Sequence, residues 1–364
     1  MNTPSIMEES PIRVLIVDDS AFMRFTIAKR ISESPRITVV GSAKDGIEAL
    51  ELIPKLNPDV ITLDVEMPRL DGLSTLKQIM EKFPRPVIML SSLTKEGALE
   101  TVQALTYGAV DFIAKPDVKA NMSAILDDVE EKIIVAAKAK VKKINRSAIP
   151  SIRQRNILAT VPAKKVEMRH RNITTHDRIV VIGSSTGGPR ALNTLIPALP
   201  IDPEAAYVVI QHMPVGFTRS LAERLHQNSW LSVKEAEPGD QLKIGQVLLA
   251  PGGFHMVFDK TGTVKLNQNP PMHGVRPAVD VTLISLAQNF GSQIISVTLT
   301  GMGNDGTTGA TLVNSSGGIV LAESEESCVV WGMPRSIYEA GIADKNVHIN
   351  DMSTEIVNYL KGTN

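Results

Sequence analysis

The stretch Gly183-Ser184-Ser185-Thr186-Gly187-Gly188 has residue types and a spacing that suit nucleophilic catalysis. It fits the pattern G-x-S-x-G, in which the glycines permit a sharp turn and the central serine, Ser185, is exposed at its tip. The amide of Thr186 would then bind an oxyanion. A glycine-rich phosphate cradle or a simple tight turn explains the same letters equally well. No lysine follows the glycines, which excludes a Walker A loop, and the dinucleotide spacing G-x-G-x-x-G is absent.

A histidine suited to act as a base lies at the end of another apolar run. His212 follows the run 207–211, which predicts a strand that delivers the imidazole to its carboxyl end. A lone histidine is more often structural than catalytic. His255 and His273 do not have this placement at a strand end, so His212 is the preferred base for Ser185.

An acid and a further amide follow a third apolar run. Residues 294–299 lead into a glycine turn that presents Asp305. Its carboxylate could orient the imidazole of His212, and the amide of Met302 in the same turn could be a second oxyanion donor. A local Asx turn explains Asp305 equally well when it is taken alone. The conjunction of three strand ends is more specific and predicts a triad of Ser185, His212 and Asp305.

Acidic, hydroxyl and lysine side chains end several predicted strands nearer the start of the chain. They are Asp18 and Asp19 after 12–17, Asp64 at the end of 59–64, Ser91 in 87–92 and Lys115 in 111–116. Carboxylate oxygens are the ligands that Mg²⁺ prefers, and a lysine could hold the oxygens of a phosphoryl group. Any one of these acids alone is more often a solvated loop residue or a helix cap. Together, at successive strand ends, they predict a site for Mg²⁺ and a phosphoryl group.

The elements that must position these residues read as two parallel α/β units. In the first, strands at 12–17, 37–43, 59–64, 87–92 and 111–116 alternate with helical stretches such as 21–32 and 46–56. Continuous apolar strands of this kind belong to doubly wound sheets that are covered on both faces. The second unit has strands at 178–182, 207–211 and 294–299, and a β-hairpin that contains 247–250. Open parallel sheets bind ligands at the carboxyl edge of their strands, which is where the candidate residues lie.

The composition describes a globular chain with apolar material for more than one core. The chain has 364 residues, 43% of them hydrophobic, and a formal net charge of −1, which predicts two or three domains. No apolar run approaches the roughly 20 residues of a membrane span, and the acidic opening does not resemble a signal peptide. We therefore expect a cytoplasmic protein. The single cysteine, Cys328, excludes an internal disulfide and is interpreted as a buried inert thiol.

A basic stretch separates the two units. Residues 132–178 contain thirteen Lys and Arg against two acids, a net charge of +11, and they become polar and punctuated by proline. Such a block could bind nucleic acid or an acidic surface, but it lacks interleaved aromatic residues and any DNA-binding motif. A solvated linker is the favoured interpretation. The expected division is a first domain at 11–132, a linker at 133–176 and a second domain at 177–364.

The first domain resembles a two-component receiver domain. The matching motifs are Val17-Asp18-Asp19-Ser20, Leu63-Asp64-Val65-Glu66-Met67-Pro68-Arg69-Leu70-Asp71-Gly72, Ser91-Ser92 and Lys115-Pro116. The resemblance implies a flavodoxin-like fold of five parallel strands. It also implies that Asp64 is the phosphoacceptor and that a histidine kinase is the phosphodonor. The Mg²⁺ needed for phosphorylation would be bound by Asp18, Asp19, Asp64 and the backbone of Glu66.

The same resemblance implies a phosphorylation switch. Ser91 would be the switch hydroxyl, and Lys115 would contact the phosphate. Receivers usually carry an aromatic switch residue three positions before that lysine, and here the position is Phe112. Phenylalanine lacks the hydroxyl that a tyrosine would carry at this position.

The second domain resembles the catalytic domain of the chemotaxis protein-glutamate methylesterases, the CheB family, in which a receiver precedes the catalytic domain. The motifs are Gly183-Ser184-Ser185-Thr186-Gly187-Gly188, Gln211-His212-Met213-Pro214-Val215-Gly216-Phe217-Thr218-Arg219, Ala250-Pro251-Gly252-Gly253-Phe254-His255-Met256, Leu299-Thr300-Gly301-Met302-Gly303-Asn304-Asp305-Gly306 and Trp331-Gly332-Met333-Pro334-Arg335. The family often has Ala at the position of Ser184, which leaves two adjacent serines here. The G-x-S-x-G spacing selects Ser185.

The CheB resemblance implies phosphorylation-regulated hydrolysis of glutamate γ-methyl esters on methyl-accepting chemoreceptors, with release of methanol. Deamidation of receptor glutamines is implied as well. Neither nucleic acid nor membrane insertion is expected, and the ester reaction requires no metal. A regulator whose output domain only binds a partner and a hydrolase of small metabolic esters stay open as alternatives.

Overall fold

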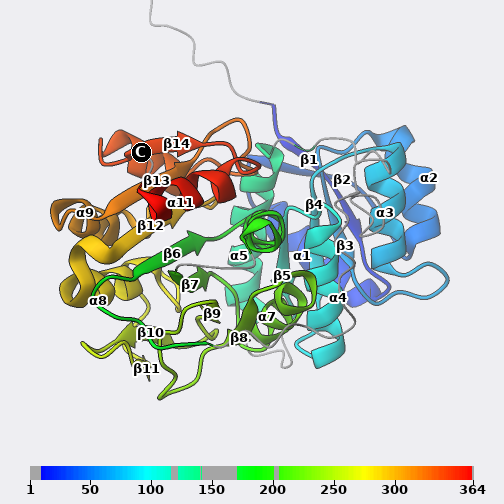
Figure 1. Cartoon of the computed structure of the whole chain (residues 1–364). Helices are drawn as coiled ribbons and strands as arrows, with labels where there is room; N and C mark the ends of the chain where they lie inside the picture. The colour runs from blue at the N-terminus through cyan, green and yellow to red at the C-terminus, as the bar shows by residue number, and fades with distance from the viewer. Residues whose placement is uncertain (1–9, 116–121, 140, 142–169, 201–204, 363–364) are drawn as a thin grey trace, which may run out of the picture. The chain divides into compact units, whose positions relative to one another are not determined.

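The computed structural model describes residues 10–115, 122–139, 141, 170–200 and 205–362. The chain separates into two units, Met1–Ile149 and Pro150–Asn364, each with its own sheet. Figure 1 colours the first unit from blue to teal and the second from green to red. Both units are α/β, as predicted.

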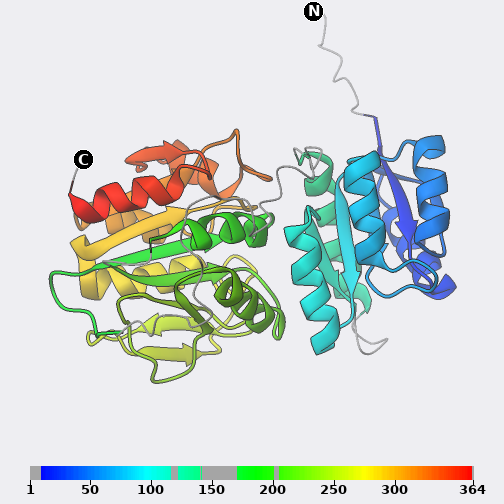
Figure 2. The same ribbon diagram turned by 45° about the vertical axis from the view of Figure 1, so that its right-hand side comes forward.

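The first unit is a five-stranded parallel sheet with the strand order β2-β1-β3-β4-β5. Its strands are β1 (Ile12–Val17), β2 (Ile37–Ala43), β3 (Val60–Asp64), β4 (Val87–Ser91) and β5 (Asp111–Ala114). Its helices are α1 (Ala21–Ile31), α2 (Gly46–Leu56), α3 (Gly72–Lys82), α4 (Lys95–Thr106) and α5 (Met122–Ala137). Helices α1 and α5 pack together on one face, and α2, α3 and α4 form a row on the other (Figure 2). The predicted flavodoxin-like receiver fold is confirmed.

Side-chain caps begin four of these helices at the residues that the sequence supplies for the purpose. Ser20, Asp45, Asp71 and Thr94 each accept a hydrogen bond from a backbone amide in the first turn of the helix that follows. Ser20 comes directly after the two acids that end β1. Because α1 begins immediately after these two acids, both of them stay at the carboxyl edge of the sheet.

The last helix of the first unit extends past the predicted domain boundary at 132. Ile133 and Ala136 are buried in α5. Lys132, which opened the predicted basic stretch, donates to the carbonyl of Phe112 at 2.5 Å and lies 3.6 Å from an Asp111 carboxylate oxygen. Its charge is therefore compensated within the first unit. Residues 142–169 of the predicted linker lie outside the described residues.

The second unit is built on a seven-stranded parallel sheet with the order β14-β13-β12-β6-β7-β9-β8. Its strands are β6 (Arg178–Ser184), β7 (Ala205–Gln211), β8 (Ser232–Glu235), β9 (Gln246–Leu249), β12 (Ile294–Thr298), β13 (Ile319–Glu323) and β14 (Lys345–Val347). A separate antiparallel hairpin is formed by β10 (His255–Phe258) and β11 (Val264–Asn267). The predicted hairpin therefore exists, but its placement at 247–250 was wrong because β9 joins the parallel sheet.

Helices cover this sheet and close its core. They are α6 (Gly188–Leu195), η2 (Ile196–Ala198), α7 (Phe217–Asn228), α8 (Val279–Phe290), η3 (Gly291–Gln293), α9 (Thr307–Ser315), α10 (Met333–Glu339) and α11 (Met352–Lys361). One core cluster joins alternate residues of β6 and β7 to the inner sides of α8, α9 and α10. After β6, the chain forms β7, β8 and β9 on one side of that strand and then returns to form β12 on its other side. The strand order thus reverses beside β6, where open parallel sheets bind their ligands.

The second unit begins before the predicted boundary at 177. Arg171 makes two hydrogen bonds of 2.6 Å to the carboxylate of Asp177. The amide of Ile173 donates to the carbonyl of Leu242, and the amide of Ile244 donates to the carbonyl of Arg171. Residues 171–177 are therefore packed onto the second unit.

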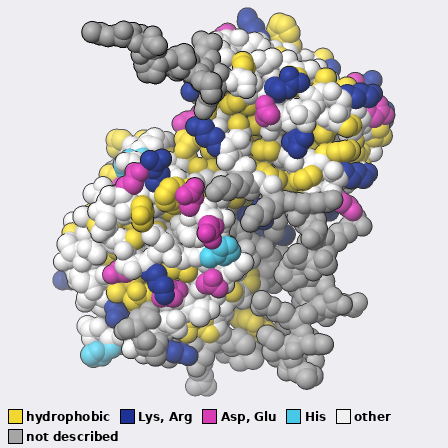
Figure 3. Space-filling view, turned by 90° about the horizontal axis from the view of Figure 1, so that it is seen from above, with side chains coloured by type: hydrophobic (Ala, Val, Ile, Leu, Met, Phe, Trp, Pro, Cys, Tyr) yellow, Lys and Arg dark blue, Asp and Glu magenta, His cyan; other side chains and the backbone are white. Residues whose placement is uncertain are grey.

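Charged side chains of both signs are interspersed with apolar ones over the face shown in Figure 3. This mixture agrees with the net charge of −1 for the whole chain. Across the described ranges, none of the helices combines the length and hydrophobicity that a bilayer crossing needs.

Candidate active site and phosphorylation site

The turn after β6 places Ser185 at the carboxyl edge of the second sheet. The Ser185 amide donates to the carbonyl of Thr300 at 3.1 Å, which ties the turn to the segment after β12. Gly187 has φ +80°, and a Cβ there would lie 2.6 Å from Val329 Cβ, so glycine is required on both counts. This is the sharp strand-to-helix turn that the sequence predicts.

The two adjacent serines have different environments. Ser184 is fully buried, and its hydroxyl donates to Gln211 Oε1 at 2.7 Å. Ser185 is half-buried and follows the last residue of the strand. Gln211 Nε2 also donates to the carbonyls of Ser185 and His212, at 2.9 and 3.2 Å. Ser184 therefore holds Gln211, and Gln211 connects the ends of β6 and β7.

His212 and Asp305 form a close pair next to this turn. His212 Nε2 lies 2.8 Å from Asp305 Oδ2, and the amide of His212 donates to the carbonyl of Ser184 at 3.1 Å. A carboxylate only accepts, so Nε2 carries the proton in this pair and Nδ1 of a neutral imidazole keeps its lone pair. Between Ser185 and His212, both described, the structure records no side-chain hydrogen bond; such bonds often form only when substrate is present.

Asp305 is held by contacts from distant parts of the chain rather than by a local Asx turn. Its carboxylate accepts from the amides of Val279 at 2.6 Å and Asp280 at 2.9 Å, in the first turn of α8. Burial acts to raise the pKa of Asp305, but hydrogen bonds from His212 and from these two amides outweigh it and hold the pKa below its ordinary value. Asp305 therefore stays anionic beside the imidazole.

The segment that carries Met302 is fixed next to the serine turn. The Thr300 hydroxyl donates to the carbonyl of Thr186 at 3.0 Å, and the Thr300 amide donates to the buried carboxylate of Glu323 at 2.8 Å. Among the described residues, none accepts a hydrogen bond from the Met302 amide. That amide is available to a ligand.

A second cluster lies at the carboxyl edge of the first sheet. Lys115 Nζ lies 2.9 Å from Asp18 Oδ2 and 2.7 Å from Asp64 Oδ2. Asp18 and Asp64 are buried, whereas Asp19 is exposed. One oxygen from each of these three acids lies within 4.8 Å of the others, which suits a small divalent cation with oxygen ligands. The structure thus brings the predicted acids and the lysine together.

The charges of this cluster are strongly coupled. Burial raises the pKa of Asp64 to about 6, against the lowering effect of Lys115 and with a further raising effect of Asp18. Burial acts to lower the pKa of Lys115, but the carboxylates of Asp64 and Asp18 outweigh it and the pKa is raised. Lys115 is therefore cationic, and Asp64 ionises near neutral pH.

The remaining residues predicted for this site lie around it. The Ser91 hydroxyl donates to the carbonyls of Ser92 and Gly97, both at 3.1 Å, and so contacts the start of α4. The side chain of Phe112 is buried in β5. The Glu66 amide donates to Asp64 Oδ1 at 3.3 Å, and its carboxylate accepts from Ser92 Oγ at 2.9 Å.

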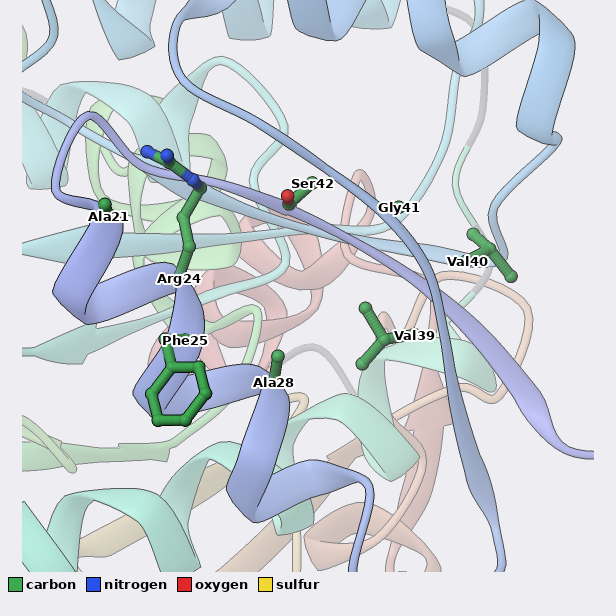
Figure 4. A pocket seen from close by; sticks show the side chains of 8 residues that line it. All are labelled: Ala21, Arg24, Phe25, Ala28, Val39, Val40, Gly41 and Ser42. Carbon is green, nitrogen blue, oxygen red and sulfur yellow. The ribbon is translucent and has the colours of Figure 1, made fainter.

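A pocket of about 410 Å³ lies between α1 and β2 (Figure 4). It is lined by Ala21, Arg24, Phe25, Ala28, Val39, Val40, Gly41 and Ser42. Arg24 Nη1 donates to the backbone carbonyls of Asp18 and Asp19, at 2.8 and 3.0 Å. The pocket neighbours the acidic cluster but contains none of its carboxylates.

Comparison with known proteins accounts for both units. Residues 14–127 match the response regulator receiver domain, and residues 180–356 match the CheB methylesterase domain. A protein-glutamate methylesterase/protein-glutamine glutaminase of Symbiobacterium thermophilum is 47% identical over 96% of this chain and 97% of its own. The chain belongs to the CheB methylesterase family.

Other members of the CheB family are similarly close. The protein of the same name from Thermotoga maritima is 47% identical over 93% of this chain and 95% of its own. The one from Pyrococcus abyssi is 44% identical over 95% of this chain and 93% of its own. The crystal structure of the Thermotoga maritima CheB catalytic domain is 49% identical, covers 50% of this chain and 98% of its own, and has a TM-score of 0.49.

Three polar residues of this CheB chain that the sequence did not single out, and one histidine that it set aside, support the site. Gln211 and Glu323 are the last residues of strands β7 and β13. A search for polar residues at the carboxyl ends of the predicted strands could therefore have found them. Asp280 lies in the first turn of α8, and His273, which the sequence analysis set aside together with His255, lies 2.9 Å from its carboxylate. Their proximity to Asp305 depends on how loops pack, and no sequence pattern indicates it.

Proposed function

We propose that the chain hydrolyses glutamate γ-methyl esters on methyl-accepting chemoreceptors, releasing methanol, and deamidates receptor glutamines by the same acyl chemistry. Its close relatives carry the name of both activities. The observation that carries the proposal is the pair of His212 and the buried Asp305, 2.8 Å apart, at the same sheet edge as Ser185.

In the proposed reaction, Ser185 Oγ attacks the ester carbonyl and its proton passes to His212 Nδ1. The proton is then given to the departing methoxide, which leaves as methanol, and an acyl-enzyme ester joins the glutamyl carbon to Ser185. Water attacks this ester with His212 again as base, and glutamate and free serine are restored. Asp305 stabilises the imidazolium, and the amides of Thr186 and Met302 are the proposed oxyanion donors.

The first unit would control this activity through phosphorylation. Asp64 is the proposed phosphoacceptor for a histidine kinase, and Lys115 would contact the phosphoryl oxygens. Mg²⁺, bound by Asp18, Asp19, Asp64 and the backbone of Glu66, would neutralise charge on those oxygens. Ser91, whose hydroxyl now contacts the start of α4, and Phe112 are the proposed switch residues.

The proposed domains follow the packing at both ends of the basic stretch. The receiver would extend through the end of α5 at Ala137, because this helix packs on the first sheet. The catalytic domain would begin near 170, because residues 171–177 bond to the second unit.

Methanol release separates this function from its alternatives. Wild-type protein is incubated with membranes that carry methylated receptors and, separately, with a small methyl ester, and Ser185→Ala is the matched control. We expect methanol from the receptors, little from the small ester and none with the variant. Equal rates on both substrates would indicate a general esterase, and no methanol from either would leave only a binding role.

A further inference from the structure

His273 occupies a tight turn that histidine seldom adopts. Met272 and Val275 exchange backbone hydrogen bonds of 3.2 and 3.0 Å across it. Between them His273 has φ +53° and Gly274 has φ +77°, both left-handed. Turns of this form favour Asn, Asp or Gly at the first of these positions. A histidine held in this conformation points to a side-chain contact that compensates the strain.

That contact is with a fully buried carboxylate. His273 Nε2 lies 2.9 Å from Asp280 Oδ2 and 3.9 Å from Asp305 Oδ1. Asp280 is 0% exposed, and its other oxygen accepts from the Gly309 amide at 2.7 Å. The side chain of His273 is 33% exposed. Among the described residues, it is the only side chain recorded as a donor to Asp280, so this buried carboxylate is bonded by a residue at the surface. Without it, Oδ2 of a buried carboxylate would lose its partner, which is costly.

Asp280 also connects this turn to the proposed catalytic acid. The backbone amides of Val279 and Asp280 donate to the two oxygens of Asp305, at 2.6 and 2.9 Å. The first turn of α8 is thus fixed by the Asp280 side chain and in turn fixes Asp305. All four oxygens of the two carboxylates accept an N–H, which favours a hydrogen-bonded network over a metal site.

We propose that His273 is a positioning residue for the esterase: through Asp280 and the first turn of α8, it holds the Asp305 carboxylate against His212. This inference rests on the proposed function. The titratable groups that face His273 are Asp280 on α8 and Asp305 after β12. On its own segment, Arg276 directs its guanidinium to the carbonyls of Gln268 and Asn269 instead.

Two substitutions of this exposed turn residue separate its hydrogen bond from its charge. His273→Ala removes both, whereas His273→Gln keeps an N–H near the position of Nε2 and cannot be charged. Both retain the left-handed backbone, so the strain is matched. His176→Ala is the control, because that histidine is exposed and its recorded bond uses only the backbone amide.

The measurement is methanol release from methylated receptors by the full chain, analysed as kcat and KM. We expect His273→Ala to lower kcat by about 10- to 100-fold, the range for residues that orient a reacting group through another, with KM within twofold. His273→Gln should recover most of kcat.

Three outcomes have distinct meanings. A kcat like that of the wild type in a folded His273→Ala protein would overturn the inference, as would equal losses in the Ala and Gln variants. Melting temperatures of all variants confirm that they are folded. Absence of methanol release by the wild type would refute the proposed function itself, before any His273 variant is compared.

Discussion

At the scale of single residues, the environment of each serine decides its role. Ser184 and Ser185 are neighbours, but one hydroxyl is sealed against Gln211 and the other lies at the turn. The sequence pattern selected Ser185 from the spacing of glycines alone. The structure adds a physical reason, since a fully buried hydroxyl cannot reach an ester on another protein.

The two serines therefore give a sharp paired prediction. Ser185→Ala should lower kcat on the order of 10⁴–10⁶-fold because the covalent route disappears. Ser184→Ala should leave kcat within a few-fold but lower the free energy of unfolding by about 1–2 kcal/mol, because Gln211 Oε1 loses its donor. Methanol release and urea unfolding measure the two effects. The reverse result in the activity assay would place the nucleophile at Ser184.

The raised pKa of Asp64 predicts a dependence of stability on pH. With a pKa of about 6 in the folded state, Asp64 binds its proton more tightly than in the unfolded chain. This contribution to stability is present at acid pH and is lost as the pH rises through about 6, so the ionised carboxylate destabilises the receiver at neutral pH. Asp64→Asn should raise the free energy of unfolding by about 1–3 kcal/mol at pH 7.5 without divalent cations, and by less at pH 5. Urea unfolding at both pH values measures this, and a less stable variant at pH 7.5 would contradict it.

At the scale of elements, most of what the sequence could predict follows from one rule: parallel sheets bind ligands at the carboxyl ends of their strands. Asp18, Asp64 and Lys115 meet at one sheet edge, and Ser185, His212 and Asp305 follow neighbouring strands of another, because parallel strands share a carboxyl edge. The segment 247–250 was misplaced because a short, fully apolar run fits a hairpin or a central strand equally well. The Asp280 and His273 pair could not be predicted, since its contact depends on how the turn packs against α8.

The packing of β6 against α8 gives a prediction at this scale. A Cβ at Gly183 would lie 2.7 Å from Val279 Cγ1 and 3.4 Å from its Cβ. Gly183→Ala should therefore destabilise the second unit by about 1–3 kcal/mol, through overpacking. Adding Val279→Ala removes the closest atoms, so the double variant should lose less than the sum of the single ones. Additive losses in thermal or urea unfolding would show that the two positions do not compete for space.

At the scale of the whole molecule, one chain joins a phosphorylatable unit to a hydrolytic one through a basic stretch. The sequence located both units, and folded elements of each unit extend into the basic stretch 132–178. Lys132 and Arg171 were both counted in the basic stretch 132–178, yet each pairs with an acid of a folded unit, Asp111 and Asp177. Charge counts alone cannot show such pairing, because it depends on the tertiary positions of the acids.

We predict that the unphosphorylated receiver restrains the esterase. A fragment that starts before 170, and so keeps the bonds of Arg171, should hydrolyse receptor esters about 5- to 150-fold faster than the unphosphorylated full chain, the usual range of coupling between sites. Rates of methanol release under identical conditions measure the difference. A slower fragment would point instead to a receiver that recruits the substrate.

The central claim is that Asp64 controls chemistry at Ser185, and methanol release with and without a phosphodonor tests it most directly. Full-length wild type and Asp64→Asn are each incubated with methylated receptor membranes and Mg²⁺, in the presence or absence of acetyl phosphate. We expect acetyl phosphate to accelerate the wild type and to leave the variant at its basal rate. Equal acceleration of both proteins would remove Asp64 from the mechanism and contradict the account.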